Sequence, residues 1–214
     1  SRELSMQPSI DYFSNHRLKL RFPWRLYHAP IVAALERAVA LSPGPDVLNL
    51  GSGPFFELER LAAGGRRFTV CDIDPRAVEL ASTLHAARLA GADVVPPDGA
   101  LPYADCSFDA VVSMDVIEHV PEPLPWLREA LRVLKPGGLL FLTTPNYGSR
   151  SLRVIENTAL EAVARLQRFS RKHLHPTKMD EARLSRVLRE AGVQTLNIER
   201  IAFDWVLSAF GRKS

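Results

Sequence analysis

Residues 47–55, with the sequence VLNLGSGPF, decide the fold class of this chain of 214 residues. Residues 47–50 form a short apolar run between a proline-rich turn and a glycine turn, which predicts a buried β-strand. The glycines at positions 51 and 53 have no side chain, so the backbone can turn sharply there and approach a ligand closely. A Gly-x-Gly turn by itself is a weak indication of a cofactor site.

Similar apolar runs alternate with helical patterns along the rest of the chain. Apolar residues recur at i, i+3, i+4 and i+7 over residues 77–84, 127–134 and 184–191. Continuous apolar strands suit a parallel sheet that is covered on both faces. The alternation therefore predicts a doubly wound, mostly parallel α/β sheet of the Rossmann-like kind, with an antiparallel last strand. The further strands are expected at 68–72, 92–95, 108–114, 139–143, 193–201 and 205–210.

Turn and cap residues divide the chain into segments of one expected domain, 1–214. An N-terminal cap segment covers 1–42, with a helix beginning at Pro30, and the cofactor-binding core covers 43–145. Residues 146–178 are expected to form a lid, because they follow the fifth strand at the sheet edge where open α/β sheets bind ligands. A permanently docked helix is the alternative. A C-terminal helix and strands, 179–214, complete the domain, with Asp180 and Gly192 as helix caps and Asp74 capping the helix from Pro75.

Composition narrows the class of protein. Hydrophobic residues make up 46% and charged residues 24% of the chain, as in soluble globular proteins. No run of about 18 apolar residues is present, so no transmembrane segment is expected. The absence of a signal pattern predicts a cytoplasmic protein. Two cysteines support neither a disulfide framework nor a cysteine metal site.

Charge is unevenly distributed along the chain. Residues 29–145 carry a net charge of −6, and the flanking segments 1–28 and 146–178 carry +3 and +5. Basic segments can attract phosphate, carboxylate or a membrane surface. They form no dense stripe, and no RNA-binding module is recognisable, so nucleic acid is not the favoured partner.

Acidic residues follow the second and third predicted strands. Asp72 lies 21 residues after Gly51, close to the offset of about 20 at which a carboxylate can accept ribose hydroxyls. Asp98 and Gly99 form a further short turn, where a carboxylate could accept from an adenine amino group. Phe56 stands where a dinucleotide fingerprint requires glycine, so NAD and FAD are disfavoured.

Five stretches, in order and spacing, resemble class I S-adenosylmethionine-dependent methyltransferases, particularly the group that contains the ubiquinone-pathway O-methyltransferases. They are VLNLGSGPF (47–55), VCDIDP (70–75), DGALP (98–102), SFDAVVSMDVIEHV (107–120) and LREALRVLKPGGLLFLTTPN (127–146). The resemblance covers about residues 45–146, and LSRVLREAG (184–192) extends it. The chain departs from the family at Asn49, usually Asp or Glu, and at Phe55, usually glycine.

The resemblance implies S-adenosylmethionine as cofactor and S-adenosylhomocysteine as product. It implies that Gly51 and Gly53 line the methionine part, that Asp72 binds the ribose, and that Met114 lies beneath the sulfonium. Asn49 can still accept a hydrogen bond, and Arg25 could pair with the cofactor carboxylate. The implied cofactor-binding residues are Arg25, Asn49, Gly51, Ser52, Gly53, Asp72, Ile73, Asp98, Gly99, Ala100 and Met114.

Histidines are the candidate general bases, because the pKa of imidazole lies near neutral pH. His119 and His175 are predicted to be catalytic, whereas His16, His28 and His85 are expected at the surface. If the turn after the fourth strand is helical, Asp115, Glu118 and His119 share a face. A Mg²⁺ site there, completed by His175, resembles that of metal-using relatives. It is possible but not favoured, because Asp115 is shorter than their glutamate.

The sequence thus predicts a methyltransferase that acts on a small-molecule acceptor, preferably at a hydroxyl oxygen. The acceptor could be a phenol or hydroquinone, a sugar hydroxyl or a secondary metabolite, with an acidic or lipid-like part. Peripheral membrane contact is compatible with the basic segments. The alternatives are N-methylation, RNA modification, and cofactor binding without catalysis; the oligomeric state is not predicted.

Overall fold

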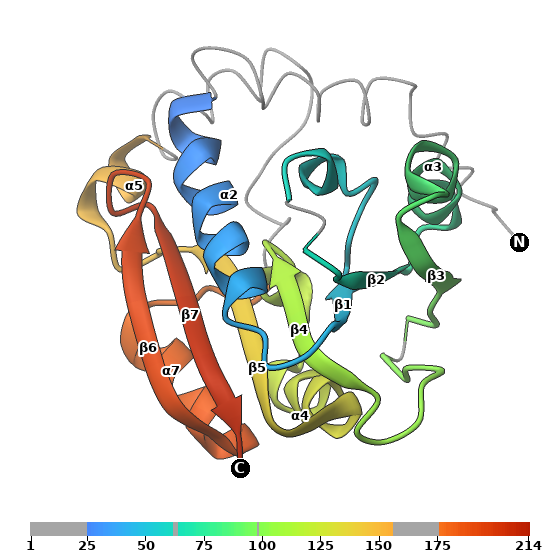
Figure 1. The fold of residues 1–214 in the computed structure, drawn as a ribbon. Coiled ribbons are helices and arrows are strands. Elements are labelled where there is room, and N and C mark those ends of the chain that lie inside the picture. The colour runs from blue at the N-terminus through green and yellow to red at the C-terminus, as the bar shows by residue number, and fades with distance from the viewer. Residues whose placement is uncertain (1–24, 62–63, 98, 156–175) are drawn as a thin grey trace, which may run out of the picture.

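The computed structural model describes residues 25–61, 64–97, 99–155 and 176–214. Seven strands form a single sheet in the order β3-β2-β1-β4-β5-β7-β6 (Figure 1). The strands are β1 (Asp46–Leu50), β2 (Arg67–Asp72), β3 (Leu89–Val94), β4 (Phe108–Met114), β5 (Leu134–Pro145), β6 (Val193–Ile201) and β7 (Val206–Lys213).

Strand direction follows the predicted scheme. β1 pairs with β2 and β4 in parallel, and the pairs β2–β3 and β4–β5 are parallel as well. β7 runs antiparallel to both of its neighbours, β5 and β6. The doubly wound, mostly parallel sheet with an antiparallel last strand is therefore confirmed.

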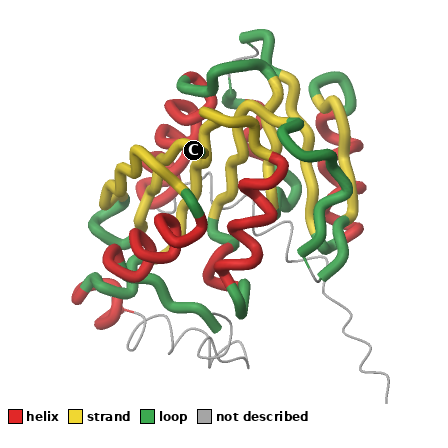
Figure 2. Tube along the Cα trace, turned by 90° about the horizontal axis from the view of Figure 1, so that it is seen from below, coloured by secondary structure: helices red, strands yellow, loops and turns green. Residues whose placement is uncertain are grey.

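Helices cover both faces of the sheet, as Figure 2 shows. The described α-helices are α2 (Arg25–Ala40), α3 (Pro75–His85), α4 (Pro123–Val133), α5 (Arg150–Ile155) and α7 (Glu181–Ala191), and two 3-10 turns are η1 (Phe56–Glu59) and η2 (Ile117–His119). The α2 and α3 helices cover one face, and α4 and α7 cover the other.

Two apolar clusters result because successive strand residues point to opposite faces. In β1, Val47 packs beneath α2, and Leu48 and Leu50 pack toward α4 and α7. The central parallel strands β1, β4 and β5 thus have apolar side chains on both faces, which is why their sequences are largely apolar.

The predicted helix caps are confirmed. The Asp74 side chain accepts from the backbone N–H of Arg76, and Asp180 accepts in the same way from Arg183. Gly192 ends α7 in the left-handed conformation with φ +106°, which glycine adopts without steric cost.

Several predicted boundaries were wrong. α2 already includes Arg25, so Pro30 lies inside this helix, in its second turn, where proline lacks the N–H for an i→i−4 hydrogen bond. β3 begins at Leu89 instead of 92, because small residues such as Gly91 give weak strand signals. β5 begins at Leu134 instead of 139, and a register shift against β4 absorbs its Pro-Gly-Gly segment. Trp205 lies in the turn before β7, not in the strand.

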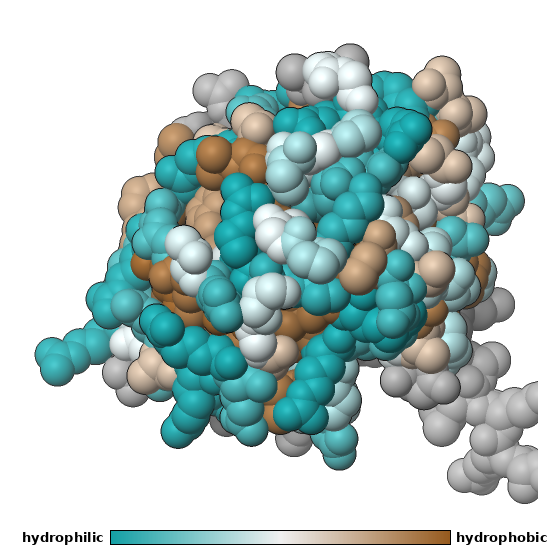
Figure 3. Space-filling view, turned by 60° about the horizontal axis from the view of Figure 1, so that its bottom comes forward, coloured by the Kyte–Doolittle hydropathy of each residue, from teal (hydrophilic) through white to brown (hydrophobic). Residues whose placement is uncertain are grey.

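Ion pairs cluster where β1 and β4 begin. Arg67 pairs with Asp46 at 2.6 Å, and Lys135 pairs with Asp109 at 2.9 Å. Figure 3, which turns this end of the molecule forward, shows mainly hydrophilic residues with smaller apolar patches between them. In the part of the chain that the structure describes, none of the helices has the length and apolarity needed to cross a bilayer.

Candidate functional site

The glycine turn lies directly after β1, at the carboxyl edge of the parallel strands. The backbone N–H groups of Gly51 and Ser52 both donate to the carbonyl of Cys71 in β2, at 2.9 and 3.1 Å. Gly51 has φ +71°, and a Cβ there would lie 2.6 Å from a methyl carbon of Val116. Gly53 also has a positive φ, but a Cβ there would meet nothing within 4 Å. Gly51 is therefore needed for packing, whereas the position of a Gly53 Cβ faces open space.

Asp72 connects the glycine turn to the end of β2. Its Oδ2 accepts from the backbone N–H of Gly53 at 2.8 Å, and its Oδ1 accepts from that of Asp74 at 3.0 Å. An ionised carboxylate offers about four acceptor positions. Two acceptor positions of Asp72 therefore remain in addition to these bonds.

Asn49 is the most unusual residue of the site. It is fully buried near the end of β1, between Val70 of β2 and Val112 of β4. Neither its Oδ1 nor its Nδ2 has a hydrogen-bond partner in the described structure. Leaving such a group unpaired costs about 1–3 kcal/mol, so an unsatisfied amide beside the glycine turn fits a site for a polar ligand group.

The conformation of Phe55 explains how the chain accommodates an aromatic residue where the family it resembles usually has glycine. The residue is in the left-handed conformation, with φ 51°, which strains a bulky side chain. Its ring is buried and packs edge-on against Phe68, with centroids 5.9 Å apart. The aromatic side chain thus points into the core beneath α2.

The predicted adenine side of the site lies beyond β2 and β3. Ile73 is 64% exposed and follows Asp72 directly, so it presents an apolar surface at the edge. Gly99 has φ +84°, and its N–H donates to the carbonyl of Pro96. Ala100 is exposed, and Asp98 lies outside the described residues. For Arg25, the structure describes the backbone at the start of α2 but not the side chain.

The turn after β4 differs from the predicted helical arrangement. Asp115 has φ 52°, and η2 begins only at Ile117, so the expectation that Asp115, Glu118 and His119 share a helix face is wrong. The Asp115 carboxylate accepts from the hydroxyl of Thr143 in β5, at 2.9 Å. The left-handed residue turns the chain before the helix can begin.

Glu118 and His119 point in different directions. Glu118 is 1% exposed and accepts from the Thr144 hydroxyl at 3.0 Å. Burial, and then the charge of Asp115, raise the pKa of this carboxyl to about 8. His119 is exposed at the turn. Among the described residues, no three His, Cys, Asp or Glu side chains lie close enough to hold a metal ion, and His175 lies outside the described residues.

His85 was wrongly expected at the surface. It is 4% exposed at the end of α3, one turn after the buried Ala81, a spacing that the sequence does show. Burial lowers the pKa of its imidazole, and the charge of Glu59, followed by the backbone of Phe55 and Pro54, opposes this shift. His85 thus supports the residues that follow the glycine turn.

Sequence reasoning also missed Asn146, the residue after β5. Its Nδ2 donates to the carbonyl of Asp204 at 2.9 Å, and its N–H donates to that of Trp205 at 2.7 Å. Asn146 thereby holds the β6–β7 turn at the carboxyl edge. A polar residue directly after an apolar strand was the available signal.

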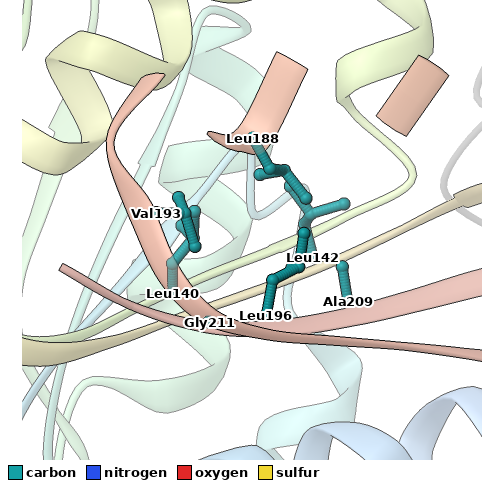
Figure 4. A pocket seen from close by; sticks show the side chains of 7 residues that line it. All are labelled: Leu140, Leu142, Leu188, Val193, Leu196, Ala209 and Gly211. Atoms are coloured by element: carbon teal, nitrogen blue, oxygen red, sulfur yellow. The ribbon is translucent and has the colours of Figure 1, made fainter. Parts of the chain in front are cut away.

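Two hollows lie on the α7 side of the sheet. The first is lined by aliphatic residues and glycine only, among them Leu140, Leu188 and Val193 (Figure 4), and is too small to hold a water molecule. The second, of about 480 Å³, lies between Asn146, Gly148 and the start of α7. Of its charged residues, Arg200 and Glu181 pair with each other at 2.8 Å, and Asp180 caps α7. Neither hollow includes the glycine turn or Asp72.

Strand order identifies the fold. A S-adenosylmethionine-dependent methyltransferase of Aquifex aeolicus has this fold, with a TM-score of 0.67 over 94% of this chain and 98% of its own, at 18% identity. A Haloferax volcanii methyltransferase, solved in complex with the Trm112 activator, gives 0.69 over 94% of each chain at 21% identity. The fold is therefore the Rossmann-like methyltransferase fold.

Sequence comparison then gives the family. Residues 48–142 match the family described as a methyltransferase domain. An uncharacterised methyltransferase of Mycobacterium sp. strain JLS is 31% identical over 192 residues, which cover 84% of this chain and 74% of the relative. One from Mycobacterium marinum is 30% identical and is covered over 73% of its length. The chain belongs to the class I S-adenosylmethionine-dependent methyltransferases; the narrower resemblance to the ubiquinone-pathway group stays a prediction.

Proposed function

We propose that this chain transfers a methyl group from S-adenosylmethionine to a hydroxyl oxygen of a small-molecule acceptor. The observation that supports this cofactor site best is the buried, unpartnered amide of Asn49 beside the glycine turn. An amide can donate and accept, so it suits the amino and carboxylate groups of the methionine part. Binding there would satisfy atoms that the protein alone leaves unpaired.

The remaining cofactor contacts that we propose come from residues at the carboxyl ends of the parallel strands. The two free acceptor positions of Asp72 suit the ribose hydroxyls, and exposed Ile73 suits one face of the adenine. Asp98, Gly99 and Ala100 complete the adenine side, and Ser52 completes the glycine turn. Met114, half-buried at the end of β4, lies beside the expected position of the sulfonium. Arg25 is proposed for the cofactor carboxylate.

S-adenosylmethionine, when bound, supplies a methyl group on a positively charged sulfur. The protein must align an acceptor with that group and take up the proton that the acceptor loses. We assign this proton to the imidazole of His119, which is exposed at the turn after β4. His175 is the second candidate base. The bound cofactor would supply the methyl group with cleavage of its carbon–sulfur bond, and His119 or His175 would take up the hydroxyl proton of the acceptor.

Isothermal titration with S-adenosylhomocysteine tests the cofactor site. Asp72→Ala should weaken binding by about 1–3 kcal/mol, because buried hydroxyls lose their acceptor. Asp105→Asn, at a carboxylate whose side chain is 74% exposed, serves as the matched control and should bind like the wild type. Equal affinities for the Asp72 variant and the wild type would remove Asp72 from the ribose site.

Mass spectrometry of a metabolite mixture tests the acceptor. Incubation with S-adenosylmethionine should add one methyl group to a hydroxyl compound, and His119→Ala should slow this reaction. A methyl group found on nitrogen would replace the hydroxyl assignment. Cofactor binding without any methylated product would favour a binding protein without catalysis.

A further inference from the structure

The turn between β6 and β7 has a backbone that its own sequence does not favour. Ala202, Phe203 and Asp204 are consecutive left-handed residues, with φ of 49°, 64° and 69°. Such a run is uncommon for residues with a Cβ, and strained backbone of this kind tends to occur at ligand sites. The turn persists because Asn146 donates to both Asp204 and Trp205, and the Trp205 N–H donates to the Ala202 carbonyl.

This backbone displays an aromatic cluster, defined here as Tyr27, Phe203 and Trp205. The rings of Phe203 and Trp205 have centroids 5.5 Å apart, and those of Tyr27 and Trp205 are 6.4 Å apart. Both separations lie in the range in which aromatic rings attract each other. Phe203 is nevertheless 64% exposed, among the highest values for a large apolar residue in the described structure.

The aromatic cluster lies beside the proposed methyl-transfer position. Figure 1 shows the β6–β7 turn next to α5 and to the first part of α2, at the end of the molecule where β4 ends. Beneath the cluster, the buried residues Ile31, Ala202 and Val206 contact both Tyr27 and Met114. Apolar packing in the core thus connects Met114, at the end of β4, with the turn.

Polar groups around the cluster are already engaged. The indole N–H of Trp205 donates to the Ser151 hydroxyl at 3.0 Å. The Asp204 carboxylate lies 3.7 Å from the Arg200 guanidinium and accepts weakly from Asn146. A polyhydroxylated acceptor such as a sugar needs several hydrogen-bond partners, whereas a flat aromatic ring needs ring faces and edges.

We propose that the aromatic cluster Tyr27–Phe203–Trp205 binds the methyl acceptor, and that the acceptor is a phenol or another planar aromatic hydroxyl compound. This inference rests on the proposed function, because it places the acceptor beside the cofactor. Phe203 is the residue that determines specificity: its exposed ring covers the aromatic nucleus, while Trp205 and Tyr27 form the wall. The acceptor hydroxyl then points toward Met114 and the methyl group.

The test uses 2-naphthol as the probe and protein saturated with S-adenosylhomocysteine. The protein carries 5-fluorotryptophan at its three tryptophans, and Trp205→Phe assigns the fluorine resonance of Trp205. We expect a saturable shift of that resonance with 2-naphthol. Phe203→Ala should weaken the affinity about threefold to tenfold, the effect of one aromatic pair. Phe203→Tyr, which keeps the ring, should restore it.

Leu41→Ala is the matched control, since Leu41 is 51% exposed but follows the opposite end of α2; it should bind 2-naphthol like the wild type. Equal affinity for cyclohexanol or methyl glucoside would overturn the aromatic preference. Unchanged 2-naphthol binding in Phe203→Ala would remove Phe203 from the site, and phosphatidylglycerol vesicle binding lost in that variant would reassign the cluster to a membrane.

The two proposals fail in different ways. Failure of S-adenosylhomocysteine to bind the wild type in calorimetry refutes the proposed cofactor site. A Trp205 resonance that does not respond to 2-naphthol in cofactor-saturated protein refutes only the aromatic acceptor.

Discussion

Replacing Glu118 by glutamine should remove a large part of the pH dependence of stability. Burial, assisted by the nearby charge of Asp115, raises the pKa of Glu118 from 4.5 to about 8 in the folded protein. The folded state therefore favours the protonated carboxyl. Its contribution to stability is complete below pH 4.5 and is lost as the pH rises through 8.

The magnitude follows from this shift. One pKa unit corresponds to 1.36 kcal/mol, so a rise from 4.5 to about 8 gives an upper bound of about 5 kcal/mol. Glutamine has nearly the same shape, carries no charge at any pH and can still accept from the Thr144 hydroxyl, which lies 3.0 Å from Oε2 of Glu118. The variant should therefore avoid the loss at alkaline pH without creating a cavity.

Urea unfolding between pH 5 and pH 9 measures the effect. The free energy of unfolding of the wild type should fall relative to that of Glu118→Gln as the pH rises, by several kcal/mol over the whole range. Glu122→Gln, at an exposed position in the same loop, should follow the wild type. The raised pKa of Glu118 would be refuted if the free energies of unfolding of the wild type and of Glu118→Gln changed with pH in the same way. It would also be refuted if the difference between these two free energies grew as the pH fell.

Three further predictions follow from the same structure. Gly51→Ala should destabilise the protein by about 1–3 kcal/mol more than Gly65→Ala in thermal unfolding, because both glycines have φ near +71° but only Gly51 meets Val116; similar losses would contradict the clash. Iodoacetamide at pH 8 should modify exposed Cys106 in the native protein and spare Cys71, since burial raises the pKa of the Cys71 thiol to about 12. Mass spectrometry identifies which cysteine carries the adduct in the native protein, and the urea-unfolded protein, in which both should react, is the control. Methyl transfer should continue in EDTA, and loss of activity that Mg²⁺ restores would instead support a metal-assisted mechanism.

The strands next to the site could be predicted because their signals are local. β4 and β6 have the bounds that the sequence indicated: β4 is a largely apolar run, and β6 begins directly after the helix-ending Gly192. The caps at Asp74 and Asp180 follow from side chains that accept from nearby N–H groups. Asp72 and the glycine turn could likewise be placed at one sheet edge, because parallel strands end there together.

Other features depend on contacts between distant segments. Nothing in the residues around Asp115 indicates a left-handed backbone, which Thr143 helps to hold from β5. Trp205 is an aromatic residue of the kind that is common in strands. Its carbonyl nevertheless accepts from the backbone N–H of Asn146, 59 residues earlier in the chain, and this bond holds it in the turn. The unpaired amide of Asn49 was also out of reach, because unsatisfied atoms are known only when every neighbour is known.

The position of β7 affects how the chain can fold while it is being translated. β6 is made before β7, but in the finished sheet it pairs only with β7 and cannot join the parallel strands directly. During translation, β1 to β5 can assemble first, while β6 waits with both edges unpaired. A nascent chain that stalls or is cut before Val206 would therefore expose the edge of β5 together with a free strand. Such a product would be prone to pair with other chains, and cells would be expected to remove it quickly.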